Sequence, residues 1–173
     1  MRKLLTIFFT ILMGIVFSGK GQADISFQNE LQRSIDRGIE SLRKSQNSEG
    51  FWTNADHPAV TALVLVAFHG NPKKPKETPE WIERGYSFIL KNVQPNGSIY
   101  APEKGLANYN TALCMMAMLA SGEAKYNPTI IKGRKYLTGQ QWDLGVKGET
   151  DHPLDGGVGY GNRYPHGDLN NTL

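Results

Sequence analysis

The chain has little cysteine and no excess of charge outside its first residues. Cys114 is the single cysteine among 173 residues, which excludes an intrachain disulfide framework and a cysteine-rich zinc module. Lys and Arg number 19 and Asp and Glu number 16, and three of the basic residues lie within residues 1–23. The rest of the chain is therefore neutral, with 16 side chains of each sign. This balance argues against nucleic acid as a partner.

The first 23 residues have the layout of a secretory signal peptide. A basic start, Met1-Arg2-Lys3, precedes an apolar run over residues 4–17, and the small residues Gly21 and Ala23 then fit positions −3 and −1 of a signal-peptidase site. An uncleaved membrane anchor is the alternative, although a run of 14 residues is shorter than the ~20 that span a bilayer. We therefore expect residues 1–23 to be a cleaved signal peptide and the remainder to be secreted or periplasmic.

The remaining residues contain an internal repeat with steps of 47 and 48 residues. A basic residue followed by glycine recurs at Arg37-Gly38, Arg84-Gly85 and Lys132-Gly133. A glutamine follows each pair, at Gln46, Gln94 and Gln141, and an aromatic residue follows each glutamine, at Trp52, Tyr100 and Tyr160. A period of this length is typical of repeat architectures. It places the repeats at about residues 27–70, 79–121 and 128–173.

Each repeat combines an amphipathic helix with an apolar one. Apolar residues at Phe27, Leu31 and Ile35 form a helical stripe with charged residues between them. The runs 58–68 and 106–120 carry no charge, and in a soluble chain such helices would be buried. The expected helices cover residues 27–45, 58–69, 79–92, 106–121 and 128–141, with the second and fourth the most buried.

The turn after each amphipathic helix has a predicted structural role. Gly50 can take a positive φ and end the helix. The amide of Gln46 can satisfy backbone groups left unpaired at helix ends, and Trp52 can shield that network from water. A direct ligand role for Gln46 and Trp52 is the alternative. Each basic-glycine pair places a glycine at the same position within a helix. This predicts that another backbone approaches each of these helices closely at the glycine.

The sequence from Arg37-Gly38 through Gln46 to Gly50-Phe51-Trp52 resembles the QW repeat of squalene–hopene cyclases. Protein prenyltransferase β-subunits share the fold of that superfamily. The resemblance covers residues 27–173, with Tyr100 and Tyr160 in place of tryptophan in the other repeats. It implies an all-α fold, a partial α/α toroid over residues 24–173. About two and a half hairpins of alternating outer and inner helices would form an open arc. HEAT or armadillo repeats have a similar period but lack this turn.

The resemblance also implies where catalytic groups would lie. Cyclases of this family protonate an alkene with an aspartic acid in a D-x-D-D motif, which this sequence lacks. Asp155, close to Asp151, is the nearest substitute, because paired carboxylates can raise one pKa, and a solvated loop is the alternative. Asp168 stands where the prenyltransferase zinc aspartate would be, but Asn170 replaces the cysteine ligand. Asp155 and Asp168 are the candidate acids, and no metal or cofactor is predicted.

Polar residues near the starts of the inner helices are candidates for ligand binding. In a toroid they would face the central cavity, and a polar rim over an apolar hole is the form of a ligand pocket. Capping of helices is the alternative role. The candidates are His57, Tyr109, Asn110, Tyr160 and His166.

We expect an exported squalene-cyclase-like or prenyltransferase-like repeat protein that acts on a hydrophobic, isoprenoid-like small molecule. Whether it is an enzyme stays open. A non-catalytic ligand-binding or scaffold toroid and a polysaccharide-acting enzyme are the alternatives. The sequence stops at Thr172-Leu173, where the earlier repeats begin their inner helices. This predicts that the sequence is a truncated piece of a longer chain, and self-association through exposed inner helices is the alternative.

Overall fold

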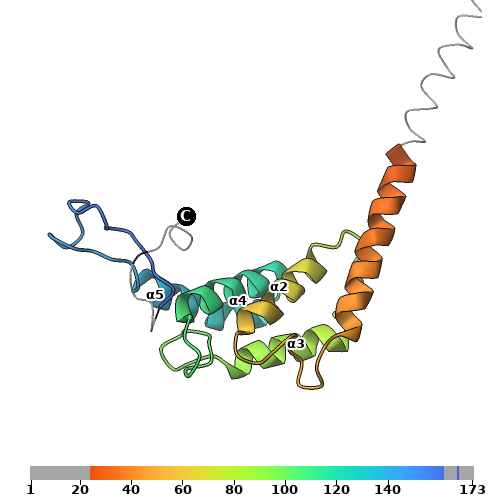
Figure 1. Ribbon diagram of the computed structural model, residues 1–173, viewed down its shortest axis with the longest axis horizontal. Coiled ribbons are helices and arrows are strands. Elements are labelled where there is room, and N and C mark those ends of the chain that lie inside the picture. Colours follow the sequence, from red (N-terminus) through yellow and green to blue (C-terminus); the bar gives the residue numbers. More distant parts are fainter. Residues whose placement is uncertain (1–23, 162–166, 168–173) are drawn as a thin grey trace, which may run out of the picture. The chain divides into compact units, whose positions relative to one another are not determined.

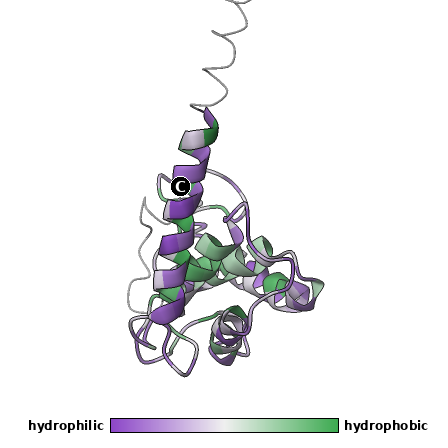
Figure 2. Ribbon diagram, turned by 90° about the vertical axis from the view of Figure 1, so that its right-hand side faces the viewer, coloured by the Kyte–Doolittle hydropathy of each residue, from purple (hydrophilic) through white to green (hydrophobic). Residues whose placement is uncertain are grey.

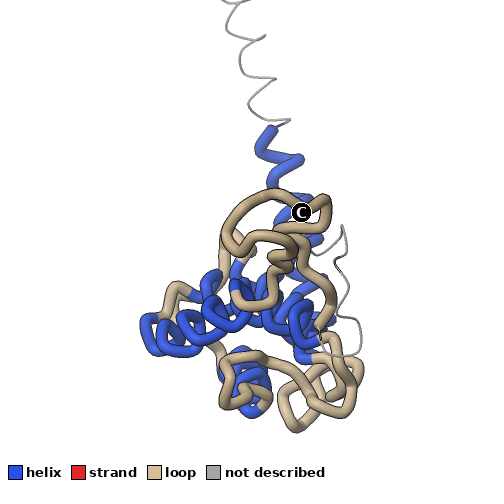
Figure 3. Tube along the Cα trace, turned by 90° about the vertical axis from the view of Figure 1, so that its left-hand side faces the viewer, coloured by secondary structure: helices blue, strands red, loops and turns tan. Residues whose placement is uncertain are grey.

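The computed structural model describes residues 24–161 and residue 167. These residues form an all-α structure, which confirms the expected fold class (Figures 1 and 3). An isolated antiparallel bridge joins Val93 and Ile99. The chain divides into two compact units, Met1–Ser41 and Leu42–Leu173, and each is described by itself. The toroid arrangement stays a prediction.

The first unit carries most of the first helix, residues 24–44, which is orange in Figure 1. The helix starts three residues before the predicted start at residue 27. Its polar side chains pair one turn apart: Gln32 Nε2 donates to Asp36 Oδ1 at 2.7 Å, and Arg37 donates to Ser34 Oγ at 3.3 Å. Such pairs stabilise a helix by roughly a few tenths of a kcal/mol each.

The second unit contains the other helices in the order that the repeat predicts. They are α2 (Pro58–His69), α3 (Glu80–Lys91), α4 (Ala107–Ser121), a 3₁₀ turn η1 (Ala124–Tyr126) and α5 (Asn127–Thr138). Both bounds of α2 match the prediction, and α3 and α4 differ from it by one residue at most at each end. The helix α5 ends three residues early, at Thr138, where Gly139 follows and its N–H bonds to the carbonyl groups of Lys135 and Tyr136.

The helices α2 and α4 form the centre of this unit. They pack against each other, α3 packs on α2, and α5 packs on α4. Seven residues of α2 and seven of α4 are buried, against five of α3 and one of α5. Figure 2 colours α2 and α4 mostly as hydrophobic. The prediction that the two charge-free helices are the most buried is therefore confirmed.

Aromatic side chains join α3 to both central helices. Tyr86 stacks on Tyr126 with ring centroids 4.8 Å apart, and its hydroxyl donates to the carbonyl of Ala117 at 2.8 Å. Trp81 meets Trp52 and Phe68 edge to face, at 6.0 and 5.4 Å. These contacts bury large apolar surfaces while satisfying the Tyr86 hydroxyl.

Candidate functional site

The turn after the first helix ties two repeats together. Gln46 Nε2 donates to the carbonyl of Gly50 at 3.0 Å and to the carbonyl of Trp81, at the start of α3, at 2.7 Å. Its Oε1 accepts a hydrogen bond from Arg84 at 2.9 Å. Trp52 is buried, and its indole N–H donates to the carbonyl of Leu42 at 2.7 Å. These bonds confirm the structural role that the sequence predicts for Gln46 and Trp52.

The second turn corrects the predicted place of Tyr100. The N–H of Trp52 bonds to Thr61 Oγ1, and in the next repeat it is the N–H of Ile99 that bonds to Thr111 Oγ1. Both side chains are buried: Ile99 is 0% exposed and Trp52 is 3% exposed. Ile99, and not Tyr100, therefore stands where the first repeat has its tryptophan.

The glutamine of the second turn is also shifted. The bonds from Asn47 N–H to the Phe51 carbonyl and from Gly50 N–H to the Asn47 carbonyl recur around Gln94. There, Gln94 N–H bonds to Ser98 and Gly97 N–H bonds back to Gln94. Gln94 therefore occupies the place of Asn47. Its amide bonds to the carbonyls of Asn92 and Tyr100, close to its own turn.

Glycines mark the places where neighbouring repeats touch. Gly50 has φ +97°, and a Cβ there would collide with the carbonyl of Arg84. Gly97 has φ +92° and faces the carbonyl of Lys132 in the same way. At Gly85 and Gly133 the close neighbours are side chains, Leu65 and Trp52 at the first and Met115 and Thr111 at the second. The expected backbone approach is thus found at the turn glycines and not at these two helix glycines.

The starts of α2 and α4 lie together and hold several predicted binding residues. Asn110 Oδ1 accepts the N–H of Ala59 at 3.0 Å, and its Nδ2 donates to the carbonyl of Leu106 at 2.9 Å. Asn110 is 0% exposed, so capping, the alternative role, accounts for it. His57 directly precedes α2, and its Nδ1 is buried without a hydrogen-bond partner among the described residues.

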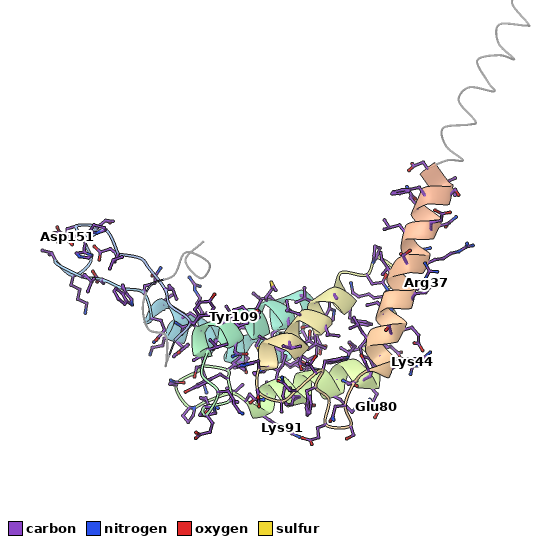
Figure 4. The ribbon with its side chains drawn as sticks, viewed as in Figure 1. Arg37, Lys44, Glu80, Lys91, Tyr109 and Asp151 are labelled. Carbon is purple, nitrogen blue, oxygen red and sulfur yellow. The ribbon has the colours of Figure 1, made fainter. Side chains whose placement is uncertain are left out.

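A segment of the third repeat covers the start of α4. Asn108 donates its N–H to the carbonyl of Tyr160 at 3.0 Å and its Nδ2 to the carbonyl of Gly159 at 2.8 Å. These bonds place the Tyr160 ring 6.2 Å from the ring of Tyr109, which is 36% exposed and is labelled in Figure 4. The structure therefore brings Tyr109 and Tyr160 together at the same end of α4 as Asn110.

A cleft of about 230 Å³ lies between α4, the end of α5 and this segment. Its aliphatic lining comes from Ala112, Leu137 and Val158, and its polar lining from Asn108, Thr138 and Gln141. We call it the α4–α5 cleft. All six lining residues are neutral, so the cleft suits an uncharged ligand with a few hydrogen-bonding groups. Sequence reasoning missed Leu137 and Thr138, because they lie on the helix that was expected to be only an outer support.

A second, larger groove of about 640 Å³ runs between the turn of the first repeat and α2. Phe51, Trp52, Val60 and Leu63 are among its lining residues. Leu63 is exposed, as are Met116 and Leu119 on α4. These apolar side chains provide surface for the predicted self-association, which stays a prediction.

The acidic loop does not give Asp155 the environment of a catalytic acid. Asp155 accepts the N–H groups of Leu144 at 2.7 Å and His152 at 2.8 Å. These bonds lower the pKa of Asp155, with the Leu144 bond contributing most, and favour the ionised carboxylate. Alkene protonation needs the opposite shift. Asp151 accepts the N–H of Val146 in the same loop, away from the helices (Figure 4).

The other predicted chemical groups divide into buried and undescribed ones. Cys114 is fully buried in α4, and burial raises the pKa of its thiol, as expected for a cysteine that packs as a hydrophobe. His166 and Asp168 lie outside the described residues.

Within the described part of the chain, no three His, Cys, Asp or Glu residues are grouped so that they could hold a metal ion. Among the same residues, no helix combines the length and apolar character needed to cross a membrane.

His69, at the end of α2, is a site that sequence reasoning did not single out. Both ring nitrogens are buried and lack hydrogen-bond partners among the described residues. The ring lies 6.0 Å from that of Tyr86. Burial, and then the charge of Lys74, lower the pKa of His69. No periodic signal marks this residue, because its neighbours come from other helices.

Comparison with protein-family models, curated proteins and solved structures finds no match for this chain.

Proposed function

We propose that this chain is an exported, ligand-binding repeat protein related to the squalene-cyclase-like and prenyltransferase-like α/α toroids. The α4–α5 cleft is the observation that carries the proposal. It combines an aliphatic lining with three neutral polar side chains, the mixture that small-molecule sites use to bind and orient a ligand.

The helical architecture supports the family relationship. The two junctions between consecutive repeats share one contact. In each, a glycine with positive φ packs on the carbonyl of a basic residue in the next outer helix. The charge-free helices lie inside and the amphipathic α3 lies against α2. This alternation is the arrangement that the resemblance implies.

Binding is favoured over cyclase-like catalysis because of the surroundings of Asp155. Its carboxylate is held ionised by backbone N–H groups, and it does not line the α4–α5 cleft. Asp155 therefore contributes a negative charge to the loop. A role in protonating a hydrocarbon would need a carboxylic acid with a raised pKa.

The test is to block the cleft and measure ligand retention. Ala112 lines the cleft and is exposed, so Ala112→Phe would fill it. Ala120, exposed on the same helix outside the cleft, gives the matched control Ala120→Phe. Native mass spectrometry after incubation with a lipid extract and with oligosaccharides should show a bound species that Ala112→Phe loses and Ala120→Phe keeps. Equal retention by both variants, or none by the original chain, would contradict the proposal.

A further inference from the structure

The central helices α2 and α4 can be compared position by position. Thr61 of α2 and Thr111 of α4 each accept the N–H of the equivalent turn residue, so counting from these threonines pairs the two helices. Asn110 of α4 accepts the N–H of Ala59 of α2 at 3.0 Å and is 0% exposed. Val60, which corresponds to Asn110, is only half-buried and lines the groove beside α2. The side of α4 that faces α2 is therefore covered, and the corresponding side of α2 is open.

This open side of α2 extends along the helix. Leu63 is 45% exposed and Ala67 is exposed, whereas Ala117, the equivalent of Ala67, is 0% exposed. Val60 and Leu63 line the groove of about 640 Å³, which we call the α2 groove, and all of its lining residues belong to the second unit. None of these lining residues carries a charge. The α2 groove therefore lies where a further inner helix would pack if the arrangement of α2 and α4 were repeated.

The helix α4 is open on its other side. Tyr109, Met116 and Leu119 are 36%, 41% and 62% exposed, and their spacing puts them in one stripe along the helix, the α4 stripe. Ala59, which corresponds to Tyr109, is 0% exposed where α2 meets α4. The helix α4 contains no charged residue. Each central helix is therefore covered on the side toward the other helix and offers a neutral, largely apolar surface on the opposite side.

We infer that the α4 stripe of one copy docks in the α2 groove of a second copy, which repeats between two chains the packing of α2 on α4 within one chain. An apolar helix in an apolar groove removes both surfaces from water, and this contact buries no unpaired charge. Met116 and Leu119, near the end of α4, do not line the α4–α5 cleft, so the inference stands apart from the proposed function. Because two different surfaces meet, the copies associate head to tail, as a closed ring or an open row.

The first measurement is sedimentation velocity of the 173-residue chain, which should self-associate as its concentration rises. Leu63→Glu places a charge in the α2 groove and should weaken this association about tenfold or more. Leu90→Glu is the matched control, because Leu90 is 41% exposed on α3, outside the groove, and this variant should associate like the original chain. An original chain that stays monomeric, or equal association by the two variants, would overturn the inference.

The second measurement tests which surfaces meet. Leu119→Glu alters the α4 stripe and keeps the α2 groove, whereas Leu63→Glu does the reverse, and circular dichroism checks that both variants keep their helices. Each variant alone should associate more weakly than Leu90→Glu, so either one tests the contact without the other. An equimolar mixture of the two should form a dimer that does not grow, because one intact groove meets one intact stripe. A mixture that is as monomeric as the separate variants, or that grows beyond a dimer, would overturn the head-to-tail pairing.

Discussion

The turn around Gly50 holds α3 and the turn around Gly97 holds α5 by the same backbone contact. Each glycine has a positive φ and packs on the carbonyl of a basic residue, Arg84 in one case and Lys132 in the other. The residue two positions later donates its N–H to a threonine hydroxyl at each turn. The backbone geometry is therefore common to both turns.

The side chains of the two turns differ although the backbone does not. Trp52 and Ile99 occupy equivalent buried places, but only Trp52 adds an indole hydrogen bond, to Leu42. Gln46 reaches across to Trp81, whereas Gln94 bonds near its own turn. The comparison shows that the glycine contact defines the repeat junction, while the glutamine and tryptophan reinforce the first junction alone.

The largest expected effect separates the two buried side chains. Trp52→Ala removes a large packed ring and a hydrogen bond, and should lower the free energy of unfolding by about 4 kcal/mol. Ile99→Ala removes less volume and no side-chain hydrogen bond, and should cost about 3 kcal/mol. Denaturant unfolding of both variants measures the difference. If Tyr100→Ala were more damaging than Ile99→Ala, the assignment of Ile99 to the tryptophan position would be wrong.

The next effect tests the glycine contact that the two turns share. Gly50→Ala combines an unfavourable φ with a collision against the Arg84 carbonyl, and should destabilise the chain by about 3 kcal/mol. Gly148 is the control, because it has φ +86° and open space around it. Gly148→Ala should therefore cost only the backbone strain, about 1 kcal/mol. Similar losses at the two positions in chemical denaturation would show that the carbonyl contact does not define the junction.

The sequence predicted the helices well, because local signals determine where they begin and end. Pro58 lacks an N–H and fits the first turn of α2. The residues after it carry no charge, which favours burial of the helix. Gly122, with φ +70°, ends α4. The register of the second turn was mispredicted, because Tyr100 preserved the aromatic pattern while the backbone bonds selected Ile99. The spacing of aromatic residues does not distinguish Ile99 from the adjacent Tyr100.

The candidate site was predicted only in part. Tyr109 and Tyr160 do come together at the start of α4, beside the buried Asn110. The cleft depends on how the end of α5 packs against α4. The spacing of residues within one helix does not predict a contact between two helices. Leu137 and Thr138 were therefore missed, although both are ordinary residues of the third amphipathic helix.

The ends of α2 and α4 give the second comparison between repeats. Counting from Thr61 and Thr111, His69 at the end of α2 corresponds to Leu119 near the end of α4. Leu119 is 62% exposed, whereas the ring nitrogens of His69 are buried near Tyr86. The helix α2, which packs against α3, thus holds a titratable group where α4 holds an apolar one.

The smallest expected effect is a pH dependence that belongs to α2 alone. Burial and the nearby Lys74 lower the pKa of His69 in the folded chain, while Glu123 opposes this shift. In the unfolded chain His69 has its ordinary pKa of about 6.5, so below about pH 6.5 the unfolded chain binds more protons than the folded chain. The free energy of unfolding therefore falls as the pH is lowered through this range. His69→Phe should reduce this loss, because an apolar ring there has no proton to bind. Thermal unfolding of both chains between about pH 7.5 and 5 measures the slope, and parallel curves would show that His69 does not contribute to it.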